Sequence, residues 1–238
     1  MKEYFCSYEE LNSIEYVYIV RKTATSPYLK IMAYRNSVVI CTSQNITETI
    51  KGMLQGKSRD EIFEMPFVYG QNIHYVPDCT YTFQFRKNIN FDFQILFDDK
   101  ILFLQGLEGF ENSLEFDDKG KTSTRAVCIA RNGEKVIGWA GAAPSSISDI
   151  WELGVEVLPE YRKAGLGTSL VRCLTKELQE QNIVPFYSAS VTNIGSQLVA
   201  ARSGYPPAWV DTYGTILDGS SSYQEILDDL TAKFLSNK

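Results

Sequence analysis

Residues 162–168, RKAGLGT, combine two basic side chains with two closely spaced glycines just before an amphipathic stretch. The first backbone N–H groups of a helix have no partner within the helix and carry the positive end of its dipole, so they can bind an anion. Gly165 and Gly167 would let a ligand approach without interference from Cβ atoms. Arg162 and Lys163 add positive charge, although Arg162 can equally brace the loop. The segment predicts a phosphate-binding turn, and a plain glycine-rich strand-to-helix turn is the alternative.

Two well-known phosphate-binding patterns do not fit this turn. A nucleoside triphosphate loop requires G-x-x-x-x-G-K-[ST], and no lysine follows Gly167. A dinucleotide-binding turn requires G-x-G-x-x-G/A, and Leu170 occupies the last of these positions. The pattern that remains is R-x-x-G-x-G, preceded by V-x-P-x-Y on the incoming strand.

This remaining pattern resembles the coenzyme-A-binding signature of the GCN5-related N-acetyltransferase (GNAT) superfamily. The likeness covers roughly residues 83–217, and the elements come in the order of that family. A narrower likeness, to the zwittermicin-resistance-type acetyltransferases, is carried by WELGVEVLPEYR and PFYS…NIGSQLVA…GYPPAW. The resemblance implies a divergent N-terminal α/β region over residues 1–82 and an acetyltransferase domain over residues 83–238. The fold expected for this domain is the GNAT acyl-CoA N-acyltransferase fold, a mixed α/β sheet.

The resemblance also implies acetyl-CoA as co-substrate, with its pyrophosphate on the turn. In the family, the strand before the turn is splayed from its neighbour, and its free backbone groups pair with the pantetheine arm. Pro159 suits the end of that strand, because proline cannot continue a ladder. Asn193 matches an asparagine that contacts the pantetheine region, and it is also an ordinary helix cap. The residues expected to bind the cofactor are Val157, Leu158, Arg162, Lys163, Ala164, Gly165, Leu166, Gly167, Thr168, Asn193 and Ser196.

Transfer of an acetyl group to an amine requires that the amine lose a proton, because a lysine-like amine titrates at about 10.4. A nearby carboxylate can accept this proton, directly or through water. Glu152 and Glu156 lie four residues apart on one predicted strand and therefore on one face. Glu152 matches the strand glutamate considered as general base in many relatives. Glutamates that face solvent and have no catalytic role are the alternative.

At the position of the residue that would protonate the leaving thiolate, this sequence differs from the family pattern. Many relatives carry a tyrosine seven residues after the asparagine, and this chain has Ala200 there. Tyr187 and Ser188 on the preceding strand are candidates to replace it, unless the thiolate leaves without a dedicated acid. The expected reaction is direct attack in a ternary complex, since no cysteine–histidine pair suggests a covalent intermediate. A catalytically silent acyl-CoA-binding sensor or scaffold is the rival interpretation.

The composition limits the partners and the compartment. A net charge of −6 argues against a nucleic-acid partner, and no apolar run approaches the roughly 18 residues of a membrane helix. The N-terminus does not resemble a signal peptide. Five scattered cysteines and the single histidine, His74, predict neither a metal site nor a disulfide framework. We expect a cytoplasmic protein that acts on a small-molecule amine, and a homodimer is compatible with the sequence.

The elements that must position these residues alternate between strands and helices. An Asn132-Gly133 pair predicts a hairpin over residues 126–142, and Ser58 and Glu61 predict a capping box. Residues 72–78 are expected to form an irregular connection. Further strands are predicted at residues 14–20, 37–42, 81–85, 91–97, 149–159, 185–191 and 209–217, and further helices at residues 43–56, 101–116, 165–181 and 193–205.

Overall fold

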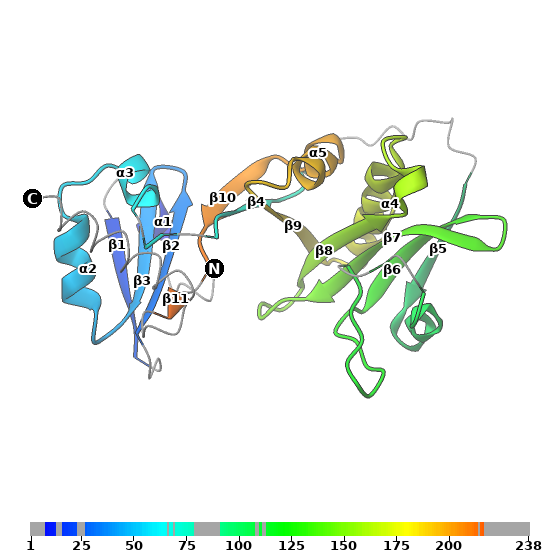
Figure 1. The fold of residues 1–238 in the computed structure, drawn as a ribbon, viewed down its shortest axis with the longest axis horizontal. Helices are drawn as coiled ribbons and strands as arrows, with labels where there is room; N and C mark the ends of the chain where they lie inside the picture. The colour runs from blue at the N-terminus through cyan, green and yellow to red at the C-terminus, as the bar shows by residue number, and fades with distance from the viewer. Residues whose placement is uncertain are drawn as a thin grey trace, which may run out of the picture. The chain divides into compact units, whose positions relative to one another are not determined.

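The computed structural model describes residues 8–12, 16–22, 27–65, 67–68, 70–78, 91–107, 110, 113–213 and 215–216. The chain forms two compact units (Figure 1). The central unit consists of residues 74–207, and the flanking unit consists of residues 1–73 and 208–238. The central unit is therefore inserted into the chain of the flanking unit. The predicted boundary at residues 82 and 83 lies outside the described residues and stays a prediction.

The flanking unit is built on a mixed sheet in which β3 (Ser37–Ser43) is central and buried along its whole length. β1 (Tyr16–Arg21) runs parallel to β3, and β2 (Tyr28–Tyr34) pairs with it in the antiparallel direction. The predictions for residues 14–20 and 37–42 thus identified β1 and β3, whereas β2 was missed.

Two short strands from late in the chain also pair with β2. β10 (Pro207–Asp211) and β11 (Thr215–Ile216) both pair with β2 in the antiparallel direction. Lys30 and Asp211 form an ion pair of 3.4 Å between largely buried side chains, and the Ile31 N–H donates to Thr212 Oγ1 at 3.0 Å. The single strand predicted over residues 209–217 is therefore two strands.

Helices cover both faces of the flanking sheet. α1 (Tyr8–Leu11) buries Leu11 against one face. α2 (Thr47–Leu54) buries Ile50 and Leu54 against the other face, whereas Met53 is exposed.

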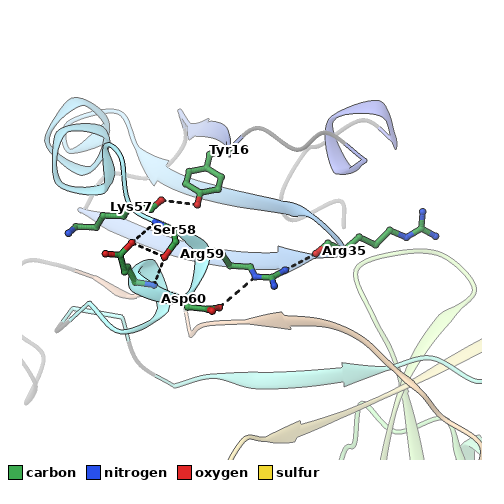
Figure 2. Close-up of polar contacts among 7 residues, drawn as sticks. Tyr16, Arg35, Lys57, Ser58, Arg59 and Asp60 are labelled. Carbon is green, nitrogen blue, oxygen red and sulfur yellow. Dashed lines mark hydrogen bonds and ion pairs between the residues drawn. The ribbon is translucent and has the colours of Figure 1, made fainter.

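α3 (Arg59–Phe63) begins at the predicted capping box. Ser58 Oγ accepts from the Glu61 N–H at 3.3 Å, and the Ser58 N–H donates to Glu61 Oε2 at 2.7 Å. Figure 2 shows this box, together with the Tyr16 hydroxyl, which donates to the Lys57 carbonyl at 2.8 Å. These local bonds satisfy N–H groups that the start of the helix would otherwise leave without partners.

The strands of the central unit pair in both directions, as predicted for a mixed sheet. Its strands lie in the order β5 (Asp92–Phe97), β6 (Ala126–Asn132), β7 (Lys135–Pro144), β8 (Ile150–Val157) and β9 (Val184–Ser190). All neighbours are antiparallel except β8 and β9, which are parallel. The predicted hairpin is confirmed: Asn132 pairs with Lys135, and Gly133 takes the positive φ of 62°.

Two predictions about the central part of the chain are wrong. Residues 72–78 contain β4 (Asn72–Tyr75) rather than irregular structure alone. The helix predicted over residues 101–116 is only a 3-10 helix, η1 (Asp98–Leu104). Gly106 follows with a φ of 79°, which ends the helical path, and residues 114–117 run on without helical structure. The strand predicted at residues 81–85 lies outside the described residues.

The helices after β8 follow the sequence closely. A short 3-10 turn, η2 (Pro159–Tyr161), leads into α4 (Leu166–Glu180), which lies across one face of the sheet in Figure 1. The four leucines spaced four residues apart in this helix, at positions 166, 170, 174 and 178, are all buried. α5 (Ile194–Arg202) follows β9 and is capped by Asn193. Among the helices of the described segments, none is long and apolar enough to cross a membrane.

Candidate functional site

β8 and β9 separate halfway along their length. Their parallel register ends at the pair Leu153 and Tyr187, while β8 continues to pair with β7 as far as Val157. Among the described residues, the second half of β8 is thus paired on one side and open on the other, as expected from the sequence.

The backbone groups at this open edge differ in part from those expected. The Leu158 N–H donates to the Ile137 carbonyl at 3.0 Å, so Leu158 belongs to the ladder with β7 and not to the free edge. Arg162 Nε donates to the Val157 carbonyl at 2.7 Å, so this side chain braces the turn. Because ladder bonds alternate along an antiparallel strand, Val155 directs its N–H and C=O away from β7. Val155 therefore provides the open edge.

A cleft of about 1000 Å³ opens where the two strands separate, and it lies within the central unit. All the predicted site residues line it except Leu158 and Ala164. Ala164 is exposed on the turn. The predicted residues that the cleft brings together are Glu152, Glu156, Val157, Arg162, Lys163, Gly165, Leu166, Gly167, Thr168, Tyr187, Asn193 and Ser196.

The turn before α4 has the properties of an anion site. Lys163 and Gly165 both have positive φ, 65° and 86°, and α4 starts with no capping side chain and no acidic residue in its first turn. A Cβ on Gly165 would meet nothing within 4 Å, so its φ and not its surroundings favours glycine. A Cβ on Gly167 would lie 3.6 Å from Val199 and 3.7 Å from Val157, an ordinary contact. The first-turn N–H groups of α4 are left for a ligand.

The two glutamates lie on the face of β8 opposite to α4. Val157 faces α4, because its Cγ2 lies near the Cβ position of Gly167. Side chains alternate between the two faces of a strand, so Glu152 and Glu156 share the other face. Both line the cleft. The cleft therefore has an α4 side that carries the anion turn and an opposite side that carries carboxylates.

A pair of glycines lets a loop lie directly on the carboxylate side of the sheet. Gly141 of β7 pairs with Gly154 of β8. A Cβ on Gly141 would lie 2.5 Å from the Ser113 carbonyl oxygen, and a Cβ on Gly154 would lie 3.0 Å from Ser113 Cβ. Trp139 Nε1 donates to Ser113 Oγ at 2.7 Å and fixes the loop. This packing brings Glu115 into the lining of the cleft.

Replacing Gly141 by Ala is expected to lower the free energy of unfolding by about 1–3 kcal/mol, because the new methyl group would overlap the Ser113 backbone. Chemical denaturation measures this change. Gly52→Ala in α2 is the matched control, since its Cβ would meet nothing within 4 Å and the change favours a helix. Equal stability of Gly141→Ala and the unaltered protein would contradict this packing.

Glu152 has a defined hydrogen-bond partner. Ser188 Oγ donates to Glu152 Oε1 across the point where β8 and β9 separate. Ser188 therefore lies on the same face as the carboxylate and orients it. The Glu152 side chain remains exposed to the cleft, where a substrate can reach it.

Tyr187 lies on the other face and is almost completely buried, at 2% exposure. Its hydroxyl lies 2.7 Å from Ser196 Oγ on α5, and the Ser196 N–H donates to the capping oxygen Asn193 Oδ1 at 3.1 Å. Burial raises the pKa of Tyr187, and the hydrogen bond with Ser196 acts in the opposite direction. Ala200 lies one turn further along the same face of α5 and is buried.

Part of the lining was not predicted from the sequence. Ser113 and Glu115 were assigned to the helix predicted over residues 101–116, so nothing in the sequence indicated that they line the cleft. Val155 could have been found only from the ladder register, which the sequence does not specify. Arg202 enters the lining from the last turn of α5 and adds a third basic side chain.

Comparison with known proteins gives one family match. Residues 93–205 match the family model of the acetyltransferase (GNAT) family, and no curated protein matches the chain. Among solved structures, a GNAT-family acetyltransferase from Colwellia psychrerythraea is 15% identical, with a TM-score of 0.43, over 60% of this chain and 56% of that chain. A GCN5-related N-acetyltransferase-like protein from Streptococcus suis is 15% identical, with a TM-score of 0.45, over 75% of this chain and 71% of that one. This chain thus spans little more than half of the Colwellia protein, and such distant structures add no argument to the family match.

Proposed function

Because residues 93–205 match the family model of the acetyltransferase (GNAT) family, we propose that the protein is an acetyl-CoA-dependent N-acetyltransferase acting on a primary amine. The observation that carries this proposal is the cleft at the separation of β8 and β9. One side of it has an uncapped helix start, and the other has an accessible carboxylate at Glu152.

Acetyl-CoA would enter along the α4 side of the cleft. The first-turn N–H groups of α4 would bind the pyrophosphate, and Lys163 and Arg202 would add positive charge. The free N–H and C=O of Val155 would pair with the amides of the pantetheine arm, as a strand edge does with any extended partner. The thioester would then reach the point where β8 and β9 separate, beside Tyr187.

The acceptor amine would react from the side of the glutamates. Glu152, oriented by Ser188, would accept the proton of the ammonium group, directly or through water. The amine nitrogen would attack the thioester carbonyl carbon, and the carbon–sulfur bond would break with its electron pair remaining on sulfur. No covalent enzyme intermediate is required.

The charges lining the cleft favour a cationic acceptor. Glu115, Glu152 and Glu156 line its carboxylate side, whereas the basic lining residues belong to the turn before α4 and to the end of α5. This separation supports a small, positively charged amine as the acceptor. The narrower likeness to the zwittermicin-resistance-type acetyltransferases and the cytoplasmic location stay predictions.

Calorimetry on the full chain tests the proposal. We expect saturable binding of both CoA and acetyl-CoA, followed by release of free thiol when a panel of small cationic amines is added. Absence of binding by the folded protein would refute the proposal. Binding without turnover on a broad amine panel would favour the silent acyl-CoA-binding module instead.

A further inference from the structure

A hydrogen-bonded pair of side chains lies at the end of the cleft where the thioester would arrive. Tyr187 belongs to the last pair of the β8–β9 register, and its ring packs edge-on against Tyr75 and Tyr205, with centroids 6.5 Å away in both cases. Its hydroxyl lies 2.7 Å from Ser196 Oγ. Ser196 is only partly buried and lines the cleft. Both residues line the cleft, and Ser196 is the more exposed member of the pair.

The direction of this hydrogen bond follows from the need of the Tyr187 hydroxyl proton for an acceptor. Within the described part of the chain, Ser196 is the hydrogen-bond partner of the Tyr187 hydroxyl. If Ser196 donated to Tyr187, the phenolic proton would be left without an acceptor in a buried place, which is unfavourable. Tyr187 therefore donates and Ser196 accepts. Burial raises the pKa of Tyr187, so the phenol keeps the proton that it donates.

The hydroxyl proton of Ser196 is then available to another acceptor. The Ser196 backbone N–H is held by Asn193 Oδ1 at 3.1 Å, and its Oγ already accepts from Tyr187. The remaining O–H bond is the one group of this side chain still free to donate. Ala200, one turn further along the same face of α5, offers no hydroxyl. A sulfur atom at the separation of β8 and β9 would therefore find Ser196 as its donor on the α5 side.

We propose that the Ser196 hydroxyl donates a hydrogen bond to the leaving CoA thiolate, and that Tyr187 is a positioning residue that fixes the direction of this bond. The inference rests on the proposed function. As the carbon–sulfur bond breaks, sulfur keeps the electron pair and Ser196 stabilises the negative charge without losing its proton. The protons of the amine leave through Glu152 to solvent. Tyr187, which is buried, therefore does not need to ionise when the thiolate leaves.

The test measures the thiol pKa of bound CoA from the ultraviolet absorbance of its thiolate. A free thiol titrates at about 8.5, and a donor that prefers the thiolate lowers this value. We expect Ser196→Ala to raise the thiol pKa of bound CoA by about one unit and Ser196→Thr to restore it. Tyr187→Phe should cause a smaller rise, because the hydroxyl of Ser196 remains but loses its orientation. Glu152, Tyr75 and Tyr205 also lie near this end of the cleft, and they are unchanged in every variant.

Ser190→Ala is the matched control. Ser190 lies on β9, as Tyr187 does, but outside the lining of the cleft. Its bound thiol should titrate as in the unaltered protein. CoA affinity, measured by calorimetry on each variant, separates failure of the proposed function from failure of the present inference. If the unaltered protein does not bind CoA, the proposed function fails and this inference fails with it. If CoA binds and neither Ser196→Ala nor Tyr187→Phe changes its thiol pKa, this inference alone is refuted.

Discussion

Glu152→Gln is expected to lower kcat by about 10²- to 10⁴-fold, the usual contribution of a general base, while the Kd for acetyl-CoA stays nearly unchanged. Glutamine keeps the size of the side chain and can still accept from Ser188, but it cannot take a proton from the ammonium group. Because Glu152 lies on the face of β8 opposite to α4, its replacement leaves the cofactor side intact. Steady-state kinetics with the best acceptor from the amine panel, together with calorimetry, measures both quantities.

Glu156→Gln is the matched control on the same strand and the same face. It should mainly raise the KM for the acceptor, because Glu156 adds negative charge to the cleft without the Ser188 contact. Unchanged turnover of Glu152→Gln would remove Glu152 from the mechanism. A larger loss of kcat in Glu156→Gln than in Glu152→Gln would assign the base to Glu156 instead.

The second large effect concerns the start of α4. Thr168 is the third residue of this helix and lines the cleft. In Thr168→Glu, a carboxylate would compete with a phosphate for the same N–H groups. Two unit charges about 5 Å apart repel by about 3 kcal/mol at an effective dielectric constant near 20, so the Kd for CoA should rise by about 100-fold. Calorimetric titration with CoA measures this change.

Thr168→Gln separates charge from size in this experiment. It should weaken CoA binding by less than about 10-fold, because it adds the same bulk without the repulsion. Thermal unfolding of Thr168→Glu should show no loss of stability, since a glutamate in the first turn is favourable to a helix. CoA affinity of Thr168→Glu equal to that of the unaltered protein would place the pyrophosphate elsewhere.

Predictions that depended on local chemistry agreed with the structure. The capping box at Ser58, the positive φ at Gly133 and the asparagine cap of α5 each involve residues within a few positions of one another. The leucine spacing of α4 fixes its buried face in the same way. Glu152 and Glu156 could be placed on one face because the period of a strand is two residues.

Predictions failed where distant contacts decide the conformation. The apolar run after Ile101 has a helical pattern, but Gly106 takes a positive φ, and the following loop packs on the sheet through Gly141 and Gly154. The free edge of β8 was expected at Val157 and Leu158, and Leu158 instead bonds to β7, because the sequence does not reveal which ladder bonds point toward β7. The hydrogen bond between Tyr187 and Ser196 could not be predicted, because it depends on how α5 lies on β9.

The return of the chain to β2 affects how the protein folds while it is being synthesised. The Ile31 backbone pairs with Thr212, a residue 181 positions later. Residues 74–206 of the central unit leave the ribosome before β10 does, so the nascent chain holds one edge of β2 uncovered during that time. Uncovered strand edges are where nascent chains associate with one another. Slow folding of the inserted unit therefore prolongs the interval in which the flanking sheet is open to aggregation.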